Sequence, residues 1–287
     1  MSKVYVLYNP LAGNGTCEEA CHSLNDVFEG EDISYIDFTT IEDEKLENFF
    51  KGLGKDDKVV LCGGDGTISH FINAVDPDQI KNEVLYFPAG SGNDFYNDID
   101  ADRLNGAMSL NKYIVRLPWV EVSGIKRRFI NGVGFGIDGY VCEEGDKLRQ
   151  TKPGRRVNYT KIALKGLIYD FKRVNATVTI DGESYEFKDV WMVPSMNGRY
   201  YGGGMMCAPN QDRLHRDNKV SIIVVHSRSR LRLLTALPTI YEGKHLKYTN
   251  IVNEFKGSRV HVKFDRPTAL QIDGDTIKDV TEYSVQL

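Results

Sequence analysis

Three glycine-rich segments in the first third of the sequence carry residue types that bind phosphate. They read NPLAGNG (residues 9–15), GGDGT (residues 63–67) and PAGSGNDF (residues 88–95). Glycine lets the backbone approach a ligand closely, and the start of a helix offers free N–H groups to an anion. One such segment alone is most often an ordinary turn between a strand and a helix. Three of them at one end of a sheet indicate a phosphate site that matches neither the Walker nor the dinucleotide-binding pattern.

Two of these segments also contain a carboxylate, Asp65 and Asp94. Carboxylates repel bare phosphate, so we expect a cation between them, most simply the Mg²⁺ that accompanies a nucleoside triphosphate. Together with the hydroxyls of Thr67 and Ser91, these residues have the chemistry that phosphoryl transfer requires, which is positioning and charge neutralisation. Asp65 is equally well explained as a helix N-cap, and the two roles are compatible.

The elements that must position these segments alternate between strand and helix over the first 115 residues. The hydrophobic pattern predicts strands at 3–10, 33–40, 58–64 and 83–90, and helices at 15–30, 42–54 and after GGDGT. Such alternation is typical of an α/β domain with an open, mostly parallel sheet. Ligands of such sheets bind beyond the carboxyl ends of the strands, where the three glycine-rich segments are expected.

The remaining residues, 116–287, consist of short alternating or apolar runs separated by turn residues. They predict a second domain, an antiparallel β-sandwich, interrupted by helices at 158–174 and at 229–243, the latter bent or divided by Pro238. Residues 1–110 hold 7 Lys and Arg against 21 Asp and Glu, whereas the rest of the chain holds 29 against 19. The basic second domain either faces an anionic partner or has its basic residues scattered over a solvated surface.

Several classes of protein are disfavoured by the composition. No apolar run approaches the roughly 20 residues that a membrane-spanning helix needs, and the N-terminus does not resemble a signal peptide. The odd set of five cysteines suits reduced thiols in a cytoplasmic protein, and the six histidines show no metal-binding spacing. Basic stretches are present without a nucleic-acid recognition motif, so we expect no nucleic-acid partner.

In this order and spacing, the three glycine-rich segments resemble the diacylglycerol kinase catalytic-domain family, which includes bacterial lipid kinases and is related to sphingosine kinases. The resemblance continues through FINGVGFGIDGYV (129–141), NGRYYGGGMMCAPN (197–210), RDNKVSIIVV (216–225) and ALQIDGD (269–275). It therefore covers nearly the whole chain. It implies a nucleotide-binding α/β domain at 1–115, a β-sandwich lipid-substrate domain at 116–287, and an active site with ATP and Mg²⁺ in the interdomain cleft.

Carried over by position, the resemblance assigns residues to three roles. The catalytic residues are Asp65, Asp94 and Asp275, of which Asp275 stands where the family usually has a glutamate that acts as general base. Without the family context, the DGD sequence at 273–275 is simply a hairpin turn. Nucleotide-binding positions are Asn9, Pro10, Gly13, Thr39, Thr40, Gly63, Gly64, Gly66, Thr67, Ser91 and Asn93.

Two further sites follow from the resemblance. Asp138 matches the position that holds the lipid head group in sphingosine kinases, although an aspartate in a turn is an equally good explanation. A structural Mg²⁺ would be bound by Asp217 with the carbonyl groups of Leu214 and Lys219, and Asn218 replaces the glycine that relatives have in this loop.

The sequence thus predicts an ATP- and Mg²⁺-dependent lipid kinase of phospholipid biosynthesis, with diacylglycerol as the first candidate substrate. Phosphatidylglycerol, a sphingoid base or another lipid alcohol are the alternatives, as is a catalytically weak nucleotide-binding regulatory module. Retention of all three acids argues against that module. We expect a cytoplasmic protein that contacts an anionic membrane surface peripherally, with residues 226–248 as the favoured contact, and a homodimer is among the expected assemblies. An ordinary helix with a solvated basic edge is the alternative for that segment.

Overall fold

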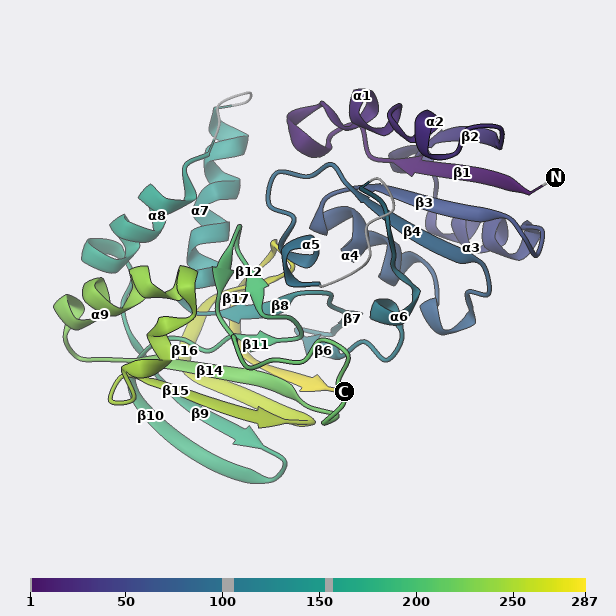
Figure 1. The fold of residues 1–287 in the computed structure, drawn as a ribbon. Coiled ribbons are helices and arrows are strands. Elements are labelled where there is room, and N and C mark those ends of the chain that lie inside the picture. Colours follow the sequence, from purple (N-terminus) through teal and green to yellow (C-terminus); the bar gives the residue numbers. More distant parts are fainter. Residues whose placement is uncertain (1, 100–105, 153–156) are drawn as a thin grey trace. The chain divides into compact units, whose positions relative to one another are not determined.

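The computed structural model describes residues 2–99, 106–152 and 157–287 (Figure 1). The chain forms two compact units. The first consists of the residues up to Leu117 together with the short segment Gly202–Gly204. The second consists of Pro118–Tyr201 and Met205–Leu287. None of the helices in the described ranges is long and apolar enough to cross a membrane.

The first unit is built on an open sheet with the strand order β2-β1-β3-β4-β5, in which only the β4–β5 pairing is antiparallel. The predicted α/β fold with a mostly parallel sheet is confirmed. The chain passes from β1 outward to β2 and then back across to β3, so the strand order changes direction between β1 and β3. Ligands of open α/β sheets bind at such a point. The strands are β1 (Lys3–Tyr8), β2 (Asp32–Asp37), β3 (Lys58–Gly63), β4 (Glu83–Pro88) and β5 (Met108–Ser109).

Side-chain bonds to the backbone shorten two elements that the sequence pattern predicted to be longer. The expected helix at 15–30 is two short helices, because the Ser23 hydroxyl donates to the Ala20 carbonyl, 2.8 Å away, and competes with helical bonding between them. The expected strand at 33–40 ends at Asp37, whose carboxylate accepts the Thr39 N–H at 2.8 Å and turns the chain into a 3₁₀ helix. The helices are η1 (Ala12–Asn14), α1 (Cys17–Cys21), α2 (Leu24–Val27), η2 (Phe38–Thr40), α3 (Asp43–Gly52), α4 (Asp65–Ala74), η3 (Pro77–Gln79), α5 (Asp94–Asp98) and α6 (Asn111–Ile114).

The second unit is an antiparallel β structure, as the sequence predicted, and its long strand β16 makes the sheet close on itself. The first half of β16 pairs with β9 and its second half with β8, and the register shifts between Lys263 and Leu270, around Pro267. The rings of Phe135 and Phe264 stack 3.8 Å apart in the core that the strands enclose. The strands are β6 (Trp119–Val122), β7 (Ile125–Arg128), β8 (Gly132–Phe135), β9 (Val174–Ile180), β10 (Glu183–Met192), β11 (Ser195–Met196), β12 (Tyr200–Tyr201), β13 (Met205–Met206), β14 (Val220–His226), β15 (Val252–Gly257), β16 (Arg259–Ile272) and β17 (Asp275–Gln286).

One long helix of the second unit, α7, was missed from the sequence. Its two glycines, Gly139 and Gly145, lower helix propensity and resemble turn residues, yet both are packing positions. A methyl group on Gly139 would lie 2.0 Å from the Ala269 carbonyl oxygen, because α7 lies directly against β16. The predicted helix at 158–174 ends early, and the predicted helix at 229–243 is divided at Pro238 into α9 and a 3₁₀ helix, as expected. The helices are α7 (Ile137–Thr151), α8 (Tyr159–Lys165), the π-helical turn η4 (Gly166–Asp170), α9 (Arg230–Ala236), η5 (Leu237–Glu242) and η6 (Lys244–Lys247).

The contact between α7 and β16 leads to the first prediction. Gly139→Ala should lower the free energy of unfolding by about 1–3 kcal/mol, because overpacking against a backbone carbonyl forces α7 away from the sheet. Gly52→Ala is the control, since nothing lies within 4 Å of the added methyl group; it should leave stability unchanged or raise it by up to about 1 kcal/mol. Urea unfolding measures both. Equal stability of the two variants would contradict this account of α7.

Candidate functional site

The three glycine-rich segments lie together at the carboxyl edge of the first unit's sheet. The segment after β1 bonds to β3 and α4: the Asn9 N–H donates to the Cys62 carbonyl at 3.1 Å, and the Asn9 side-chain amide donates to the Thr67 hydroxyl at 3.2 Å. The segment after β4 bonds to β3 through the Ala89 N–H, which donates to the Gly63 carbonyl at 2.8 Å. The clustering expected from the sequence therefore holds in the structure.

Glycine is required here because the segments touch backbone to backbone. A methyl group on Gly90 would lie 2.4 Å from the Gly64 Cα, and one on Gly13 would lie 2.4 Å from the Ala89 carbonyl oxygen. Gly66 differs, because its space is open and the residue is exposed. From the sequence, we expected glycine at these positions because the backbone must approach a ligand closely. The structure adds a second requirement for glycine, which is the close contact between the segments themselves.

Asp65 caps a helix, although a different one from the helix that it begins. Its two carboxylate oxygens accept the N–H groups of Asp94 and Phe95, at 2.9 and 2.8 Å, and so cap α5. Its own helix, α4, has Gly64 at the N-cap position. The carboxylate therefore ties the segment after β3 to the segment after β4, and it is half-buried there.

Asp94 is buried, with 5% of its surface exposed, and its carboxylate binds backbone. The two oxygens accept the N–H groups of Gly203 and Gly204, at 2.8 and 2.6 Å. The tripeptide Gly202–Gly204 has φ values of 63°, 82° and 104°, which residues with a side chain rarely adopt. Sequence reasoning missed this segment as part of the first unit; its run of three glycines was the available signal.

The other predicted nucleotide-binding residues fall into two groups. The Asn93 side chain bonds to both backbone groups of Gly90, at 2.9 and 3.2 Å, and Ser91 is exposed beside it. Pro10 is half-buried in the segment after β1. Thr39 and Thr40 instead bond to Asp37 at the end of β2. Within the described ranges, no recorded bond joins these two threonines to the glycine-rich segments.

Asp138 lies in the second unit, in the first turn of α7 rather than in a loop. The Tyr201 hydroxyl donates to its carboxylate at 2.8 Å. A methyl group on Gly134 would lie 2.7 Å from both the Asp138 Cβ and the Gln271 side-chain nitrogen, so the aspartate is packed against β8 and β16. Burial raises the pKa of Asp138 to about 7, and the bond from Tyr201 offsets part of that rise.

Asp275 begins β17, directly after the hairpin turn that the DGD sequence predicted. Its exposed carboxylate pairs with Arg127 at 2.9 Å. The turn residues Asp273 and Gly274 have φ values of 48° and 98°, as two-residue hairpins with right-handed twist require. The sequence did not reveal a role for Asp273, whose carboxylate accepts the N–H groups of residues 130–132, at 2.7 to 3.1 Å.

The loop predicted to hold a structural Mg²⁺ does not fit the ion. The Lys256 ammonium lies 3.3 Å from the Asp217 carboxylate, where a cation would bind. The Lys219 carbonyl already accepts the Gln211 amide at 3.1 Å and lies 3.2 Å from His215 Nδ1. In the described part of the chain, no three His, Cys, Asp or Glu side chains are grouped to hold a metal.

Two neighbours of this loop complete its description. Leu214, the third predicted ligand, is 40% exposed, and its N–H donates to Asp212 at 3.1 Å. Asn218 has φ 59°, so it adopts the left-handed conformation that a glycine would.

The environment of Asp138 leads to a prediction about pH. Its pKa lies near 7 in the folded protein against an ordinary value of 3.8, so the folded state holds a proton that the unfolded state releases. This residue's contribution to stability therefore falls as pH rises from about 4 to 7. The free energy of unfolding of Asp138→Asn minus that of wild type should grow over this range, by up to about 1.4 kcal/mol per pH unit. Parallel profiles in denaturant titrations would show that the carboxyl group is already ionised.

Comparisons with known proteins agree with this geometry. Residues 3–116 match the model of the diacylglycerol kinase catalytic domain, and residues 131–284 match that of the YegS C-terminal NAD kinase beta sandwich-like domain. A diacylglycerol kinase of Mycobacterium tuberculosis is 26% identical over 277 residues, covering 92% of this chain and 85% of its own. Diacylglycerol kinase 2 of Arabidopsis thaliana is 26% identical over 258 residues, covering 76% of this chain and 36% of its own.

A solved structure shows the same fold. The crystal structure of a diacylglycerol kinase from Bacillus anthracis superposes with a TM-score of 0.64 at 20% identity, covering 99% of this chain and 93% of that one. The catalytic-domain model matches the part of the chain that forms the α/β sheet, and the sandwich-like model matches the part that forms the antiparallel sheet. The chain belongs to the diacylglycerol kinase catalytic-domain family.

Proposed function

We propose that the protein transfers the γ-phosphoryl group of ATP to a lipid hydroxyl, with diacylglycerol as the first candidate and phosphatidic acid as the product. Its family supports a lipid kinase at the level of the reaction class. The observation that carries the proposal is the mutual contact of the three glycine-rich segments at the carboxyl edge of one sheet. Contact between them fixes several backbone segments at the place where ligands of such sheets bind.

The phosphate groups of ATP would lie on the segments after β1, β3 and β4. The Thr67 hydroxyl accepts a bond from Asn9, which leaves its own hydrogen to donate. Gly66 and Ser91 are exposed and border the same edge. Mg²⁺ would arrive with the nucleotide and neutralise charge on the phosphates.

The three acids would differ in role. Asp65 and Asp275 are the candidate proton acceptors for the lipid hydroxyl; the exposed Asp275 carboxylate accepts a bond from Arg127 through Oδ2. Asp94 is better explained as a positioning residue because it is buried, whereas Asp65 is half-buried; both carboxylates accept two backbone N–H groups.

Asp138 is the candidate contact for the lipid head group. With a pKa near 7, it is available as a neutral carboxyl group that donates a hydrogen bond to a hydroxyl or ester oxygen. A sphingoid amine would instead favour the ionised form as its counter-ion. The half-buried carboxyl group, bonded to a tyrosine and with a raised pKa, thus supports an uncharged lipid such as diacylglycerol.

The test is an assay of the purified protein with labelled ATP and a panel of lipids in mixed micelles. Diacylglycerol should be labelled most, ahead of phosphatidylglycerol and a sphingoid base. Labelling of another lipid in preference would keep the lipid kinase and change its substrate. Nucleotide binding without labelling of any lipid would overturn the proposal in favour of a regulatory nucleotide-binding module.

A first variant addresses Asp65. Asp65→Asn should reduce phosphoryl transfer by about 10²–10⁴-fold, because a positioned acid or base contributes that much. Asp37→Asn is the matched control, since Asp37 also caps a helix in the first unit; it should retain activity. Thermal unfolding shows whether both variants fold. Normal turnover by folded Asp65→Asn would remove this residue from the mechanism.

A second pair of variants addresses Asp275. Asp275→Asn should lower kcat strongly and leave the affinity for ATP nearly unchanged, since a base acts on the hydroxyl in the transition state. Asp275→Glu should retain or raise activity, because the longer side chain keeps the carboxylate. An inactive glutamate variant beside an active asparagine variant would show that Asp275 has no catalytic role.

A further inference from the structure

Three of the five cysteines lie together in the core of the first unit. Cys17 and Cys21 are the first and last residues of α1, and Cys62 lies near the end of β3; all three are fully buried in one cluster. The Cys17 and Cys62 sulfurs are 3.6 Å apart, and the Cys17 thiol also donates to the Cys62 carbonyl at 3.4 Å. Because both are free thiols, this pair holds two hydrogen atoms that an oxidant can remove.

Both ends of the glycine-rich segment 9–15 meet at this pair. Tyr8, the last residue of β1, is directly opposite Cys62 in the parallel sheet, and the Asn9 N–H donates to the Cys62 carbonyl at 3.1 Å. At the other end of the segment, Cys17 begins α1. A bond between the two sulfurs would therefore tie the second end of the segment to the strand that already holds the first.

Cys17 is the partner of Cys62 because of how the three thiols are bonded. The Cys21 thiol donates to the Glu18 carbonyl at 3.1 Å and so bonds within its own helix. The Cys17 thiol instead faces β3. A disulfide bond is about 2.05 Å long, so the Cys17 and Cys62 sulfurs need to approach each other by only ~1.5 Å.

The two thiols of the pair differ in reactivity. The hydrogen bond between them lowers the pKa of Cys17, whose thiolate accepts it, and raises the pKa of Cys62, which donates it. Burial raises the pKa of Cys62 further, and it opposes the decrease at Cys17. The thiolate is the form of cysteine that attacks an oxidant. Cys17 is thus the thiol of this pair that reacts first.

A small oxidant reaches Cys17 when α1 opens locally. The helix has five residues, and the side chain of its N-cap residue, Thr16, makes no capping bond to it. Helices this short are marginal on their own. Thr16 and Glu18, on either side of Cys17, are already exposed. Local opening of a short peripheral segment requires much less free energy than global unfolding.

We propose that Cys17 and Cys62 are a modification site at which a hydroperoxide forms a disulfide that lowers the affinity of the first unit for its nucleotide. The Cys17 thiolate attacks a peroxide oxygen, the O–O bond breaks, and the products are a sulfenic acid and one water. The Cys62 sulfur then displaces the hydroxyl group, which leaves with the Cys62 proton as a second water. Two thiols are oxidised and one peroxide is reduced to two waters. A dithiol reverses the modification by exchange.

The disulfide lowers nucleotide affinity because it displaces a segment that has no room to move. Asn9 is bonded to β3 and α4, and a methyl group on Gly13 would lie 2.4 Å from the Ala89 carbonyl oxygen. Displacements of about 1 Å are enough to disturb positioned binding groups. This effect rests on the proposed function, in which the segment binds the phosphates of ATP. Formation of the disulfide itself does not depend on that function.

Peptide mass spectrometry tests the modification on the full-length protein treated with hydrogen peroxide. Wild type should lose the mass of two hydrogen atoms and yield a peptide that links Cys17 to Cys62, and dithiothreitol should remove the link. Cys17→Ala and Cys62→Ala should each prevent it. The wild-type result needs no variant to fold. A link from Cys21 to Cys62, or no link at peroxide concentrations that oxidise Cys142, would overturn the proposal.

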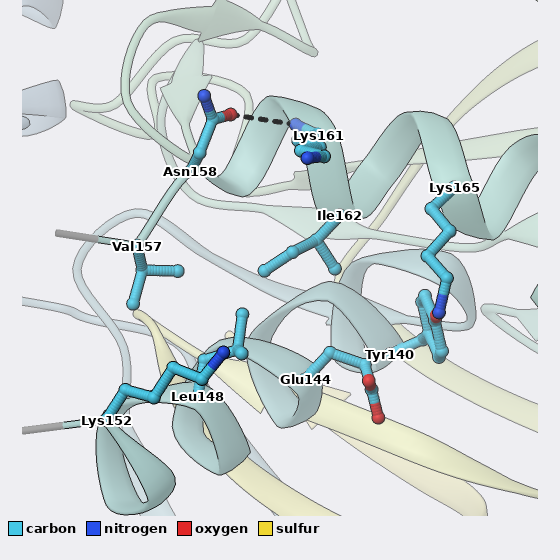
Figure 2. Close-up of a pocket in the computed structure, with 9 residues that line it drawn as sticks. All are labelled: Tyr140, Glu144, Leu148, Lys152, Val157, Asn158, Lys161, Ile162 and Lys165. Carbon is cyan, nitrogen blue, oxygen red and sulfur yellow. Dashed lines mark hydrogen bonds between the residues drawn. The ribbon is translucent and has the colours of Figure 1, made fainter. Parts of the chain in front are cut away.

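Cys142→Ala is the matched control. Cys142 is half-buried on α7 of the second unit, the helix that lines the groove in Figure 2 with Tyr140, Glu144 and Leu148. It is more exposed than the buried pair, so peroxide reaches it without local opening. Its replacement should leave both the link and the loss of nucleotide affinity unchanged. Protection of nucleotide affinity by Cys142→Ala would place the sensitive thiol in the second unit and overturn the proposal.

Calorimetric titration with ATP measures the consequence without any lipid. Oxidised wild type should bind ATP roughly tenfold more weakly than reduced wild type, and dithiothreitol should restore the affinity. Cys17→Ala and Cys62→Ala should bind ATP equally well before and after peroxide. Linked wild type with unchanged affinity would overturn the regulatory role. Reduced wild type that binds no ATP would refute the proposed function, and the mass spectrum would still decide whether the disulfide forms.

Discussion

The first unit depends on the contact between the Gly64 and Gly90 backbones. A single methyl group on Gly90 would meet the Gly64 Cα at 2.4 Å, so the segments after β3 and β4 can adopt their positions only with glycine there. With the two backbones in contact, Asp65 reaches the N–H groups that begin α5 and caps that helix. The start of α5 brings Asp94 into position, and Asp94 in turn binds Gly203 and Gly204.

These contacts form a chain in which each carboxylate is held by backbone N–H groups. Carboxylates bonded to two N–H groups are strongly oriented, because such charge-assisted bonds are about twice as strong as neutral ones. The same arrangement recurs in the second unit, where Asp273 accepts three consecutive N–H groups. Acidic residues in the glycine-rich segments of this protein therefore hold the backbone in place, and such residues are also candidates for catalysis. The residue type alone does not distinguish the structural role from the catalytic one.

The sheet of the first unit and its glycine-rich edge could be predicted from the sequence, because buried strands and glycine turns leave local signals. Helix α7 could not, since Gly139 and Gly145 weaken the helical pattern for reasons that lie in β16 and α8. The partner of Asp94 was hidden for a similar reason: the residues that it binds are more than a hundred positions away.

The predicted metal loop shows the limit of transferring a motif. Asp217 is present as expected, but the residue that decides the chemistry, Lys256, lies on the neighbouring strand β15 and is outside the motif. Likewise, the hairpin turn at 273–275 was readable from its residue types, whereas the three N–H groups bound by Asp273 come from a distant segment. Local patterns predicted elements and turns, and long-range contacts determined what the polar side chains do.

The pairing of Lys256 with Asp217 also changes how this loop responds to its surroundings. A bound ion stabilises a fold according to its free concentration, by mass action. The Lys256 ammonium is part of the chain, so each molecule carries one, whatever the ionic composition of the medium. Its partly exposed pair, 3.3 Å apart, is weakened by salt screening and is indifferent to chelators. The geometry of the loop is thus supported by a cationic group of the chain itself.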